Sequence, residues 1–170
     1  MNILGIDPSL SSTGYAIVDS DTKELIKKGR ICTFKTDSTD DRIQKIIFHL
    51  ESFNSMVDKV GIEDGFVGKG KQTSLVLSEL RGAIIAYYKY NYYEVNHELP
   101  SAIRKNFNLP GNAKKEDVAK EVLKYYPNLE SEIGPYNDKT GKNKTSDIYD
   151  AISIALSFAS RIKNGKSTES

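Results

Sequence analysis

The chain has 170 residues, of which 38% are hydrophobic and 28% are charged, and its formal net charge is +1. This composition is typical of an ordinary globular protein and predicts one domain with a sizeable core. A net charge so close to zero excludes recruitment of a polyanion by bulk charge, so a nucleic-acid site would need locally clustered cations. The single cysteine, Cys32, excludes an intramolecular disulfide and a multi-cysteine zinc site. With only two histidines as well, any metal is expected to be a hard ion with oxygen ligands.

The N-terminus has no basic segment followed by a long apolar run, and no apolar run reaches the length of a membrane span. We therefore expect a cytoplasmic protein without a membrane partner.

The first half of the chain predicts a run of strands followed by alternating helices and strands. Short apolar runs bounded by turn residues predict the strands, and apolar residues three and four positions apart predict the helices. The expected strands are 2–7, 14–19, 24–34 and 59–63, and the expected helices are 40–56 and 74–90.

The second half predicts one more strand, at 92–97, and then mostly helices. Its expected helices are 101–107, 114–126 and 146–162, with a Pro- and Asn-rich loop at 127–145 and a disordered tail at 163–170. Three consecutive strands followed by alternation predict an α/β fold. We expect a mixed five-stranded sheet, in which an antiparallel meander of three strands is joined by parallel strands and flanked by helices. No long linker divides the chain, so residues 1–162 are expected to form a single domain.

Four acidic residues are predicted to meet at one edge of this sheet. Asp7 and Glu63 each end a short apolar strand, where functional groups of α/β sheets collect. Asp147 and Asp150 lie three residues apart near the start of the last helix, along one edge of its apolar stripe. Four neighbouring carboxylates would repel one another unless cations joined them. Oxygen ligands favour Mg²⁺, for which Mn²⁺ may substitute, and two such ions could support hydrolysis of a phosphodiester.

Each acid alone has an ordinary structural explanation. Asp7 could form a turn, Glu63 could be an ion-pair partner, and Asp147 and Asp150 could be favoured by the helix dipole. The metal-site interpretation therefore depends on the joint pattern.

Three segments of the chain together resemble the RuvC family of Holliday-junction resolvases, which belongs to the ribonuclease H-like superfamily. They read LGIDPSLSSTGYAIV, VGIEDGFVGKGKQTSLVLSELRGAI and SDIYDAISIAL, and the resemblance runs from Asn2 to about Arg161. It implies a homodimeric, metal-dependent endonuclease that cleaves four-way DNA junctions by paired hydrolysis and leaves 5′-phosphate ends. It also implies that the four acids bind two metal ions per active site.

The resemblance assigns roles to further residues. Phe66 corresponds to an aromatic residue inserted at the junction crossover, and Arg104 and Lys115 correspond to lysines near the cleaved phosphate, which makes Lys115 a candidate catalytic residue. The helix that contains Arg81 corresponds to the dimer interface. The chain departs from the family at Ser9, where glycine is common, at Asp64, which adds a negative charge beside Glu63, and in its longer loop at 127–145. These departures suggest a phage-encoded member, which would act in a bacterial host cell.

Basic residues flank every acidic motif and are the expected phosphate contacts. The predicted DNA-binding residues are Phe66, Lys69, Lys71, Arg81, Arg104, Lys105, Lys114 and Lys115, and Lys139, Lys142 and Lys144 are further candidates. The alternative for each lysine is an ordinary solvated surface position, and the alternative for Phe66 is a place in the core.

The remaining aromatic, histidine and cysteine residues are assigned structural roles. The tyrosines between Tyr87 and Tyr93 are expected in the core or at a dimer contact. His97 is expected to be structural, and Cys32 to be a small buried hydrophobe.

Two other functions stay open. The chain could be a nuclease of the same fold that acts on RNA–DNA hybrids or flaps, or a junction-binding protein that does not cut. An ATPase of related appearance would need a second phosphate-binding glycine loop, which the sequence does not show convincingly.

Overall fold

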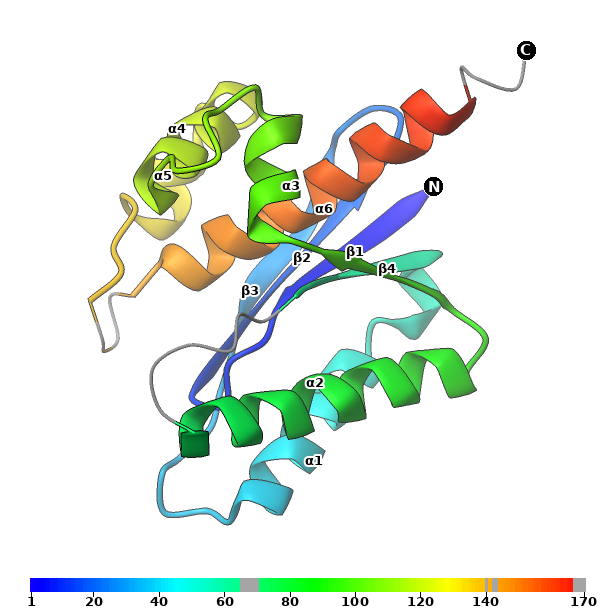
Figure 1. Ribbon diagram of the computed structural model, residues 1–170, viewed down its shortest axis with the longest axis vertical. Helices are drawn as coiled ribbons and strands as arrows, with labels where there is room; N and C mark the ends of the chain where they lie inside the picture. The colour runs from blue at the N-terminus through cyan, green and yellow to red at the C-terminus, as the bar shows by residue number, and fades with distance from the viewer. Residues whose placement is uncertain (65–70, 140, 142–143, 167–170) are drawn as a thin grey trace.

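Five strands form one mixed sheet with the order β3-β2-β1-β4-β5 (Figure 1). The computed structural model describes residues 1–64, 71–139, 141 and 144–166. β1 pairs antiparallel with β2 and parallel with β4, while β2–β3 is antiparallel and β4–β5 is parallel. The predicted mixed sheet with a three-stranded meander is therefore confirmed. The strands are β1 (Asn2–Asp7), β2 (Ser12–Asp19), β3 (Leu25–Cys32), β4 (Lys59–Glu63) and β5 (Glu94–Glu98).

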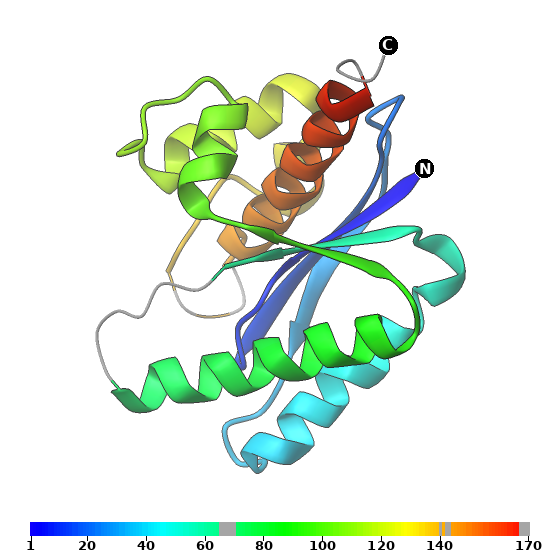
Figure 2. The same ribbon diagram turned by 45° about the vertical axis from the view of Figure 1, so that its right-hand side comes forward.

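Helices cover both faces of the sheet (Figures 1 and 2). One layer contains α1 (Thr39–Glu51) and α2 (Lys71–Tyr90). The opposite layer contains α3 (Pro100–Asn106), α4 (Lys115–Tyr125), α5 (Leu129–Ile133) and α6 (Ser146–Lys166), and a short 3₁₀ turn, η1 (Asn54–Met56), precedes β4. None of the helices in the described ranges combines the length and the apolar character needed to cross a membrane.

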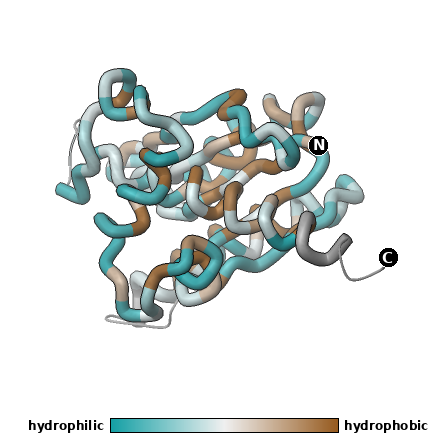
Figure 3. The backbone as a smooth tube through the Cα atoms, turned by 90° about the horizontal axis from the view of Figure 1, so that it is seen from above, coloured by the Kyte–Doolittle hydropathy of each residue, from teal (hydrophilic) through white to brown (hydrophobic). Residues whose placement is uncertain are grey.

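Apolar side chains that alternate along the strands form a hydrophobic core on each face of the sheet. Leu4 and Ile6 of β1 are fully buried on the side of α1 and α2, and Ile3 is fully buried on the side of α6. Successive side chains of a strand point to opposite faces, so one short apolar strand contributes to both cores. Seen from above, the hydrophobic stretches lie mainly towards the middle of the molecule (Figure 3).

Two glycines allow α6 to lie directly on the sheet. A Cβ atom on Gly5 would lie 2.2 Å from the carbonyl oxygen of Ala151, and one on Gly14 would lie 1.9 Å from the carbonyl oxygen of Asp147. Both distances are far below van der Waals contact, so any side chain here would displace the helix. The glycines therefore set the height of α6 above β1 and β2.

The structure corrects several boundaries. The predicted helix 40–56 ends at Glu51 and is followed by η1, and the predicted loop 127–145 contains α5, because Leu129 is buried against the core below it. α6 continues to Lys166, past the predicted end at Ile162.

The prediction for Cys32 was wrong, because its side chain is exposed. Cys32 ends β3, which is an edge strand, and the alternation that buries Ile31 points its neighbour away from the core.

The prediction for the tyrosines is confirmed in part, since Tyr88 is fully buried while Tyr90 and Tyr92 are exposed.

Gly5→Ala should lower the free energy of unfolding by about 1–3 kcal/mol, because overpacking against a helix backbone cannot be relieved by a rotamer change. Urea denaturation measures this change. Gly111→Ala is the control: Gly111 lies in the turn after α3 with no atom within 4 Å of the added Cβ, so this variant should change the free energy of unfolding by less than about 1 kcal/mol. Unchanged stability in Gly5→Ala would show that α6 can move away without cost.

Candidate active site

The register of two parallel strands places the strand-end acids side by side. Ile6 of β1 pairs with Ile62 of β4, so Asp7 and Glu63 follow at equivalent positions on neighbouring strands. Asp7 is buried and Glu63 is half-buried. The expectation that these two carboxyl groups share one edge of the sheet is thereby met.

The start of α6 brings the other two acids to the same edge. Gly14 is the partner of Asp7 in the β1–β2 register, and the backbone of Asp147 lies directly over Gly14. Asp147 and Asp150 are both buried, with 2% and 7% of their surface exposed. The start of α6 therefore extends over the edge of the sheet, as the spacing of Asp147 and Asp150 predicts.

A cleft of about 460 Å³ opens where these elements meet. Asp7, Asp147 and Asp150 line it together with Lys115, the first residue of α4. Glu63 is not one of the lining residues, but its charge raises the pKa of Asp7. Strand-end and helix acids thus act on one another across a single cleft, which we call the acidic cleft.

The acidic cleft disfavours ionisation of its carboxyl groups. Burial raises the pKa of Asp7 well above its usual value, and the charges of Asp150, Glu63 and Asp147 raise it further, against the effect of Lys115. Burial likewise raises the pKa of Asp150 to about 6, although the ion pair with Lys115 opposes the shift. Burial alone would lower the pKa of Lys115, but the negative charges of Asp150, Asp7 and Glu63 raise it above the usual lysine value. Lys115 therefore stays protonated at neutral pH.

Lysines contact both helix acids. The Nζ atom of Lys115 lies 2.5 Å from a carboxylate oxygen of Asp150, and Lys144 pairs with Oδ1 of Asp147. The second oxygen of Asp147, Oδ2, is buried and has no hydrogen-bond partner within the described residues. An unsatisfied buried carboxylate oxygen among buried acids suits a cation ligand.

In the described parts of the chain, no three acidic, histidine or cysteine side chains already form a complete metal site.

The other predicted site residues have varied positions. Lys114 lines the acidic cleft, Lys105 is exposed on α3, and Nε of Arg104 donates to the carbonyl oxygen of Ala113 at 2.8 Å. Lys71 is the first residue of α2. Phe66, Lys69 and Lys142 lie outside the described residues.

The extra charge of Asp64 is compensated. The Arg81 guanidinium pairs with Oδ1 of Asp64, and Nδ1 of His97 lies 3.4 Å from the same oxygen. Arg81, expected to contact DNA, is thus engaged with the end of β4, and His97 fits its expected structural role.

Sequence reasoning missed Tyr136, which lines the acidic cleft from the segment before α6. Thr145 fixes this segment: its Oγ1 donates to the carbonyl oxygen of Pro135 and accepts from the backbone N–H of Asn137. The ring of Tyr136 packs edge-on against Tyr149, with 5.8 Å between the centroids. Burial, with a smaller contribution from Asp150, raises its pKa, so its hydroxyl remains a donor at neutral pH. No periodic signal in the loop could have identified it.

Glu98 was also missed, although it is fully buried. Its carboxylate accepts from Asn96 at 2.5 Å and from Ser157 of α6 at 2.9 Å, and it pairs with Arg161 at 2.5 Å. Its backbone carbonyl accepts from the N–H of Asp64 at 2.8 Å. Glu98 therefore joins the ends of β4 and β5 to α6, the helix that carries two of the acids.

Comparison with known proteins identifies the family. The family described as crossover junction endodeoxyribonuclease RuvC matches residues 3–158. The chain belongs to the RuvC family.

Two curated RuvC relatives illustrate the similarity. The protein of that name from Aliarcobacter butzleri is 34% identical over 166 residues, covering 95% of this chain and 100% of the relative. The one from Helicobacter pylori strain Shi470 is 34% identical over 171 residues, covering 96% and 99%.

Solved structures show the same fold. The Thermus thermophilus RuvC structure superposes with a TM-score of 0.78 at 21% identity, covering 97% of both chains. The structure of T. thermophilus RuvC in complex with its Holliday junction substrate gives 0.76 at 20% identity, covering 97% of this chain and 96% of that one. The ribonuclease H-like architecture is thus common to this chain and RuvC.

Glu98→Gln should change the pH dependence of stability. Burial raises the pKa of Glu98, against the effects of Arg161, Ser157 and Asn96. The folded protein therefore holds this proton more tightly than the unfolded chain does. The resulting stability is fully present below the unfolded pKa of about 4.3 and is lost as the pH rises through the folded pKa.

The wild type should therefore lose stability relative to Glu98→Gln as the pH rises from about 4 to about 8. Urea denaturation of both proteins at several pH values measures this difference in unfolding free energy. Glu94→Gln, on the same strand but exposed, is the matched control for the loss of one carboxylate from β5. A flat difference for Glu98→Gln would mean that its carboxyl group titrates alike in both states.

Proposed function

We propose that this protein resolves Holliday junctions and other branched DNA as a homodimer. Each subunit would hydrolyse one phosphodiester and leave a 5′-phosphate and a 3′-hydroxyl. The observation that carries the proposal is the convergence of Asp7, Asp147 and Asp150 on one cleft bordered by lysines, in a chain of the RuvC family. A T. thermophilus RuvC binds a Holliday junction in its solved complex, which supports the same substrate for this chain.

Asp7, Glu63, Asp147 and Asp150 would hold two divalent cations per site, Mg²⁺ by preference with Mn²⁺ as a substitute. The buried, unpartnered Oδ2 of Asp147 and the raised pKa values of Asp7 and Asp150 support this assignment. Such ions, when bound, supply Lewis-acid activation of water and stabilise the leaving oxygen.

Basic and phenolic side chains of the acidic cleft would hold the substrate strand. Lys115 stays charged and lies beside Asp150, so it can steady negative charge that develops on the phosphate. Lys114 and Lys144 line the same cleft and can neutralise neighbouring phosphates. The hydroxyl of Tyr136 can donate to a phosphate oxygen.

Two symmetric sites would make paired nicks on a two-fold substrate. The dimer would form along α2, as the family resemblance implies, and the exposed Leu75 on that helix supports a contact there. We also propose that the protein acts in the cytoplasm, where a bacterial cell keeps its DNA.

Asp7→Asn should abolish cleavage while junction binding persists, because it removes a charge that the cations need and leaves the fold intact. The measurement is Mg²⁺-dependent nicking of a synthetic four-way junction, with binding followed by gel shift. The control is Asp21→Asn, which changes an exposed acid in the turn after β2. Cleavage by Asp7→Asn at the wild-type rate would remove Asp7 from the mechanism.

The substrate is tested separately with a panel at equal salt. The wild type should cut the four-way junction faster than an RNA–DNA hybrid or a flap, with Mg²⁺ or Mn²⁺. Faster cleavage of the hybrid or the flap would favour the alternative nuclease, and binding without nicks in either metal would favour a junction-binding protein.

A further inference from the structure

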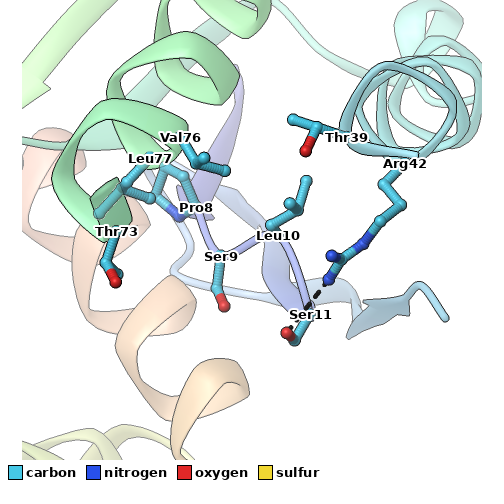
Figure 4. Close-up of a pocket in the computed structure, with 9 residues that line it drawn as sticks. All are labelled: Pro8, Ser9, Leu10, Ser11, Thr39, Arg42, Thr73, Val76 and Leu77. Atoms are coloured by element: carbon cyan, nitrogen blue, oxygen red, sulfur yellow. Dashed lines mark hydrogen bonds between the residues drawn. The ribbon is translucent and has the colours of Figure 1, made fainter. Parts of the chain in front are cut away.

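Another hollow lies beside the turn that follows β1 (Figure 4). It has a volume of about 400 Å³ and lies between the segment 8–11, the first turn of α1 and the start of α2. We call it the turn pocket. Its volume is in the usual range of about 300–1,000 Å³ for pockets that bind small organic groups. The metal and phosphate chemistry proposed above does not use it.

The walls of the turn pocket are apolar and its margin is polar. Pro8 and Leu10 face Val76 and Leu77 of α2, as Figure 4 shows. Hydroxyl groups stand around these walls, contributed by Ser9, Ser11, Thr39 and Thr73. Apolar walls with hydrogen-bonding groups at the margin suit a flat ring with polar edges, such as a nucleobase.

Hydrogen bonds hold the turn pocket in shape. Arg42 of α1 donates from Nε to Oγ1 of Thr33 at 2.8 Å and from a terminal nitrogen to Oγ of Ser11 at 3.2 Å. The hydroxyl of Thr33 donates in turn to the carbonyl oxygen of Leu10 at 2.5 Å. These bonds tie the turn to α1 and to the residue that follows β3, and they bring a permanent positive charge to the margin of the pocket.

The turn pocket adjoins the acidic cleft. Ser9 lines both hollows, and it lies only two residues after Asp7. A DNA strand with a phosphate in the acidic cleft would therefore pass beside the turn pocket within a nucleotide or two. The charge of Arg42 complements the phosphate of that nucleotide.

We propose that the turn pocket receives an unstacked base of the DNA strand whose phosphate lies in the acidic cleft. The base contacts Leu10, Val76 and Leu77 with its faces, and the serine and threonine hydroxyls bind its edge. The proposal rests on the proposed function, because it needs a DNA strand in the acidic cleft.

The test uses the full chain with Asp7→Asn, so that the junction is bound but not cut. Single 2-aminopurine bases are placed, one junction at a time, at the nucleotides flanking the cleavage position mapped with the wild type. Binding should raise 2-aminopurine fluorescence severalfold at one of these positions, because the base leaves the stack. Adding Val76→Phe, which fills the pocket, should remove this rise and weaken junction binding by about fivefold or more.

The matched control is Gln44→Phe, which adds the same ring to an exposed position of α1 that does not line the turn pocket. It should keep both the fluorescence rise and the affinity. Thr39→Phe is a second filling variant that enters from α1 and should act as Val76→Phe does, so that a folding defect in one variant does not decide the result. Circular dichroism confirms the fold of each.

Four results would overturn the proposal. If the junction binds but 2-aminopurine fluorescence rises at no position, the turn pocket holds no base and the proposed function stands. The same conclusion follows if the fluorescence rise persists in both filling variants. If the filling variants change the oligomeric state in size-exclusion chromatography, whether or not the fluorescence rise persists, the occupant of the turn pocket is a protein chain. If the Asp7→Asn protein fails to bind the junction at all, both the pocket proposal and the proposed function fall.

Discussion

The close contact between α6 and the glycines of β1 and β2 is the constraint on which the candidate site depends. The carbonyl oxygens of Ala151 and Asp147 occupy the space where Gly5 and Gly14 would carry side chains. Since α6 is a rigid helix, this contact sets both the height and the position of its first turn. A larger residue in either strand would separate the acids of the helix from Asp7. Further along α6, Glu98 binds Ser157 and Arg161, so the helix is also held beyond this contact.

The electrostatics of the acidic cleft oppose folding and favour cation binding. Burial and mutual repulsion raise the pKa values of Asp7 and Asp150, which means that the folded chain holds their negative charges at a cost. Lys115 and Lys144 reduce this cost through their ion pairs with Asp150 and Asp147. Clusters of this kind are typical of functional sites, where a chain keeps charges that stability alone would not select.

Most of the fold and the acids of the candidate site could be predicted from the sequence, because both depend on local patterns. Asp7 and Glu63 end apolar strands, and the spacing of Asp147 and Asp150 places them on one side of a helix, so neither inference needed a long-range contact. Tyr136 and Glu98 could not be predicted in this way. Tyr136 lines the cleft from an aperiodic loop that Thr145 holds in place, and Glu98 is buried with its partner Arg161 on a distant helix. The prediction that Cys32 is buried failed for a related reason, since the exposure of an edge-strand residue depends on what covers the edge of the sheet.

The turn after β1 lies between the acidic cleft and the turn pocket. Its backbone is closed by the hydroxyl of Thr13, which donates to the carbonyl oxygen of Ser9 at 2.8 Å. A glycine in place of Ser9 would offer no side chain to either hollow. Here the side chain of Ser9 lines both the acidic cleft and the turn pocket. Because Arg42 and Thr33 hold the far side of the same turn, a group that settled in the turn pocket would act on a segment that begins one residue after Asp7. Asp7 and the wall of the turn pocket that begins at Pro8 therefore lie on consecutive residues of the chain, in a turn that these hydrogen bonds hold in place.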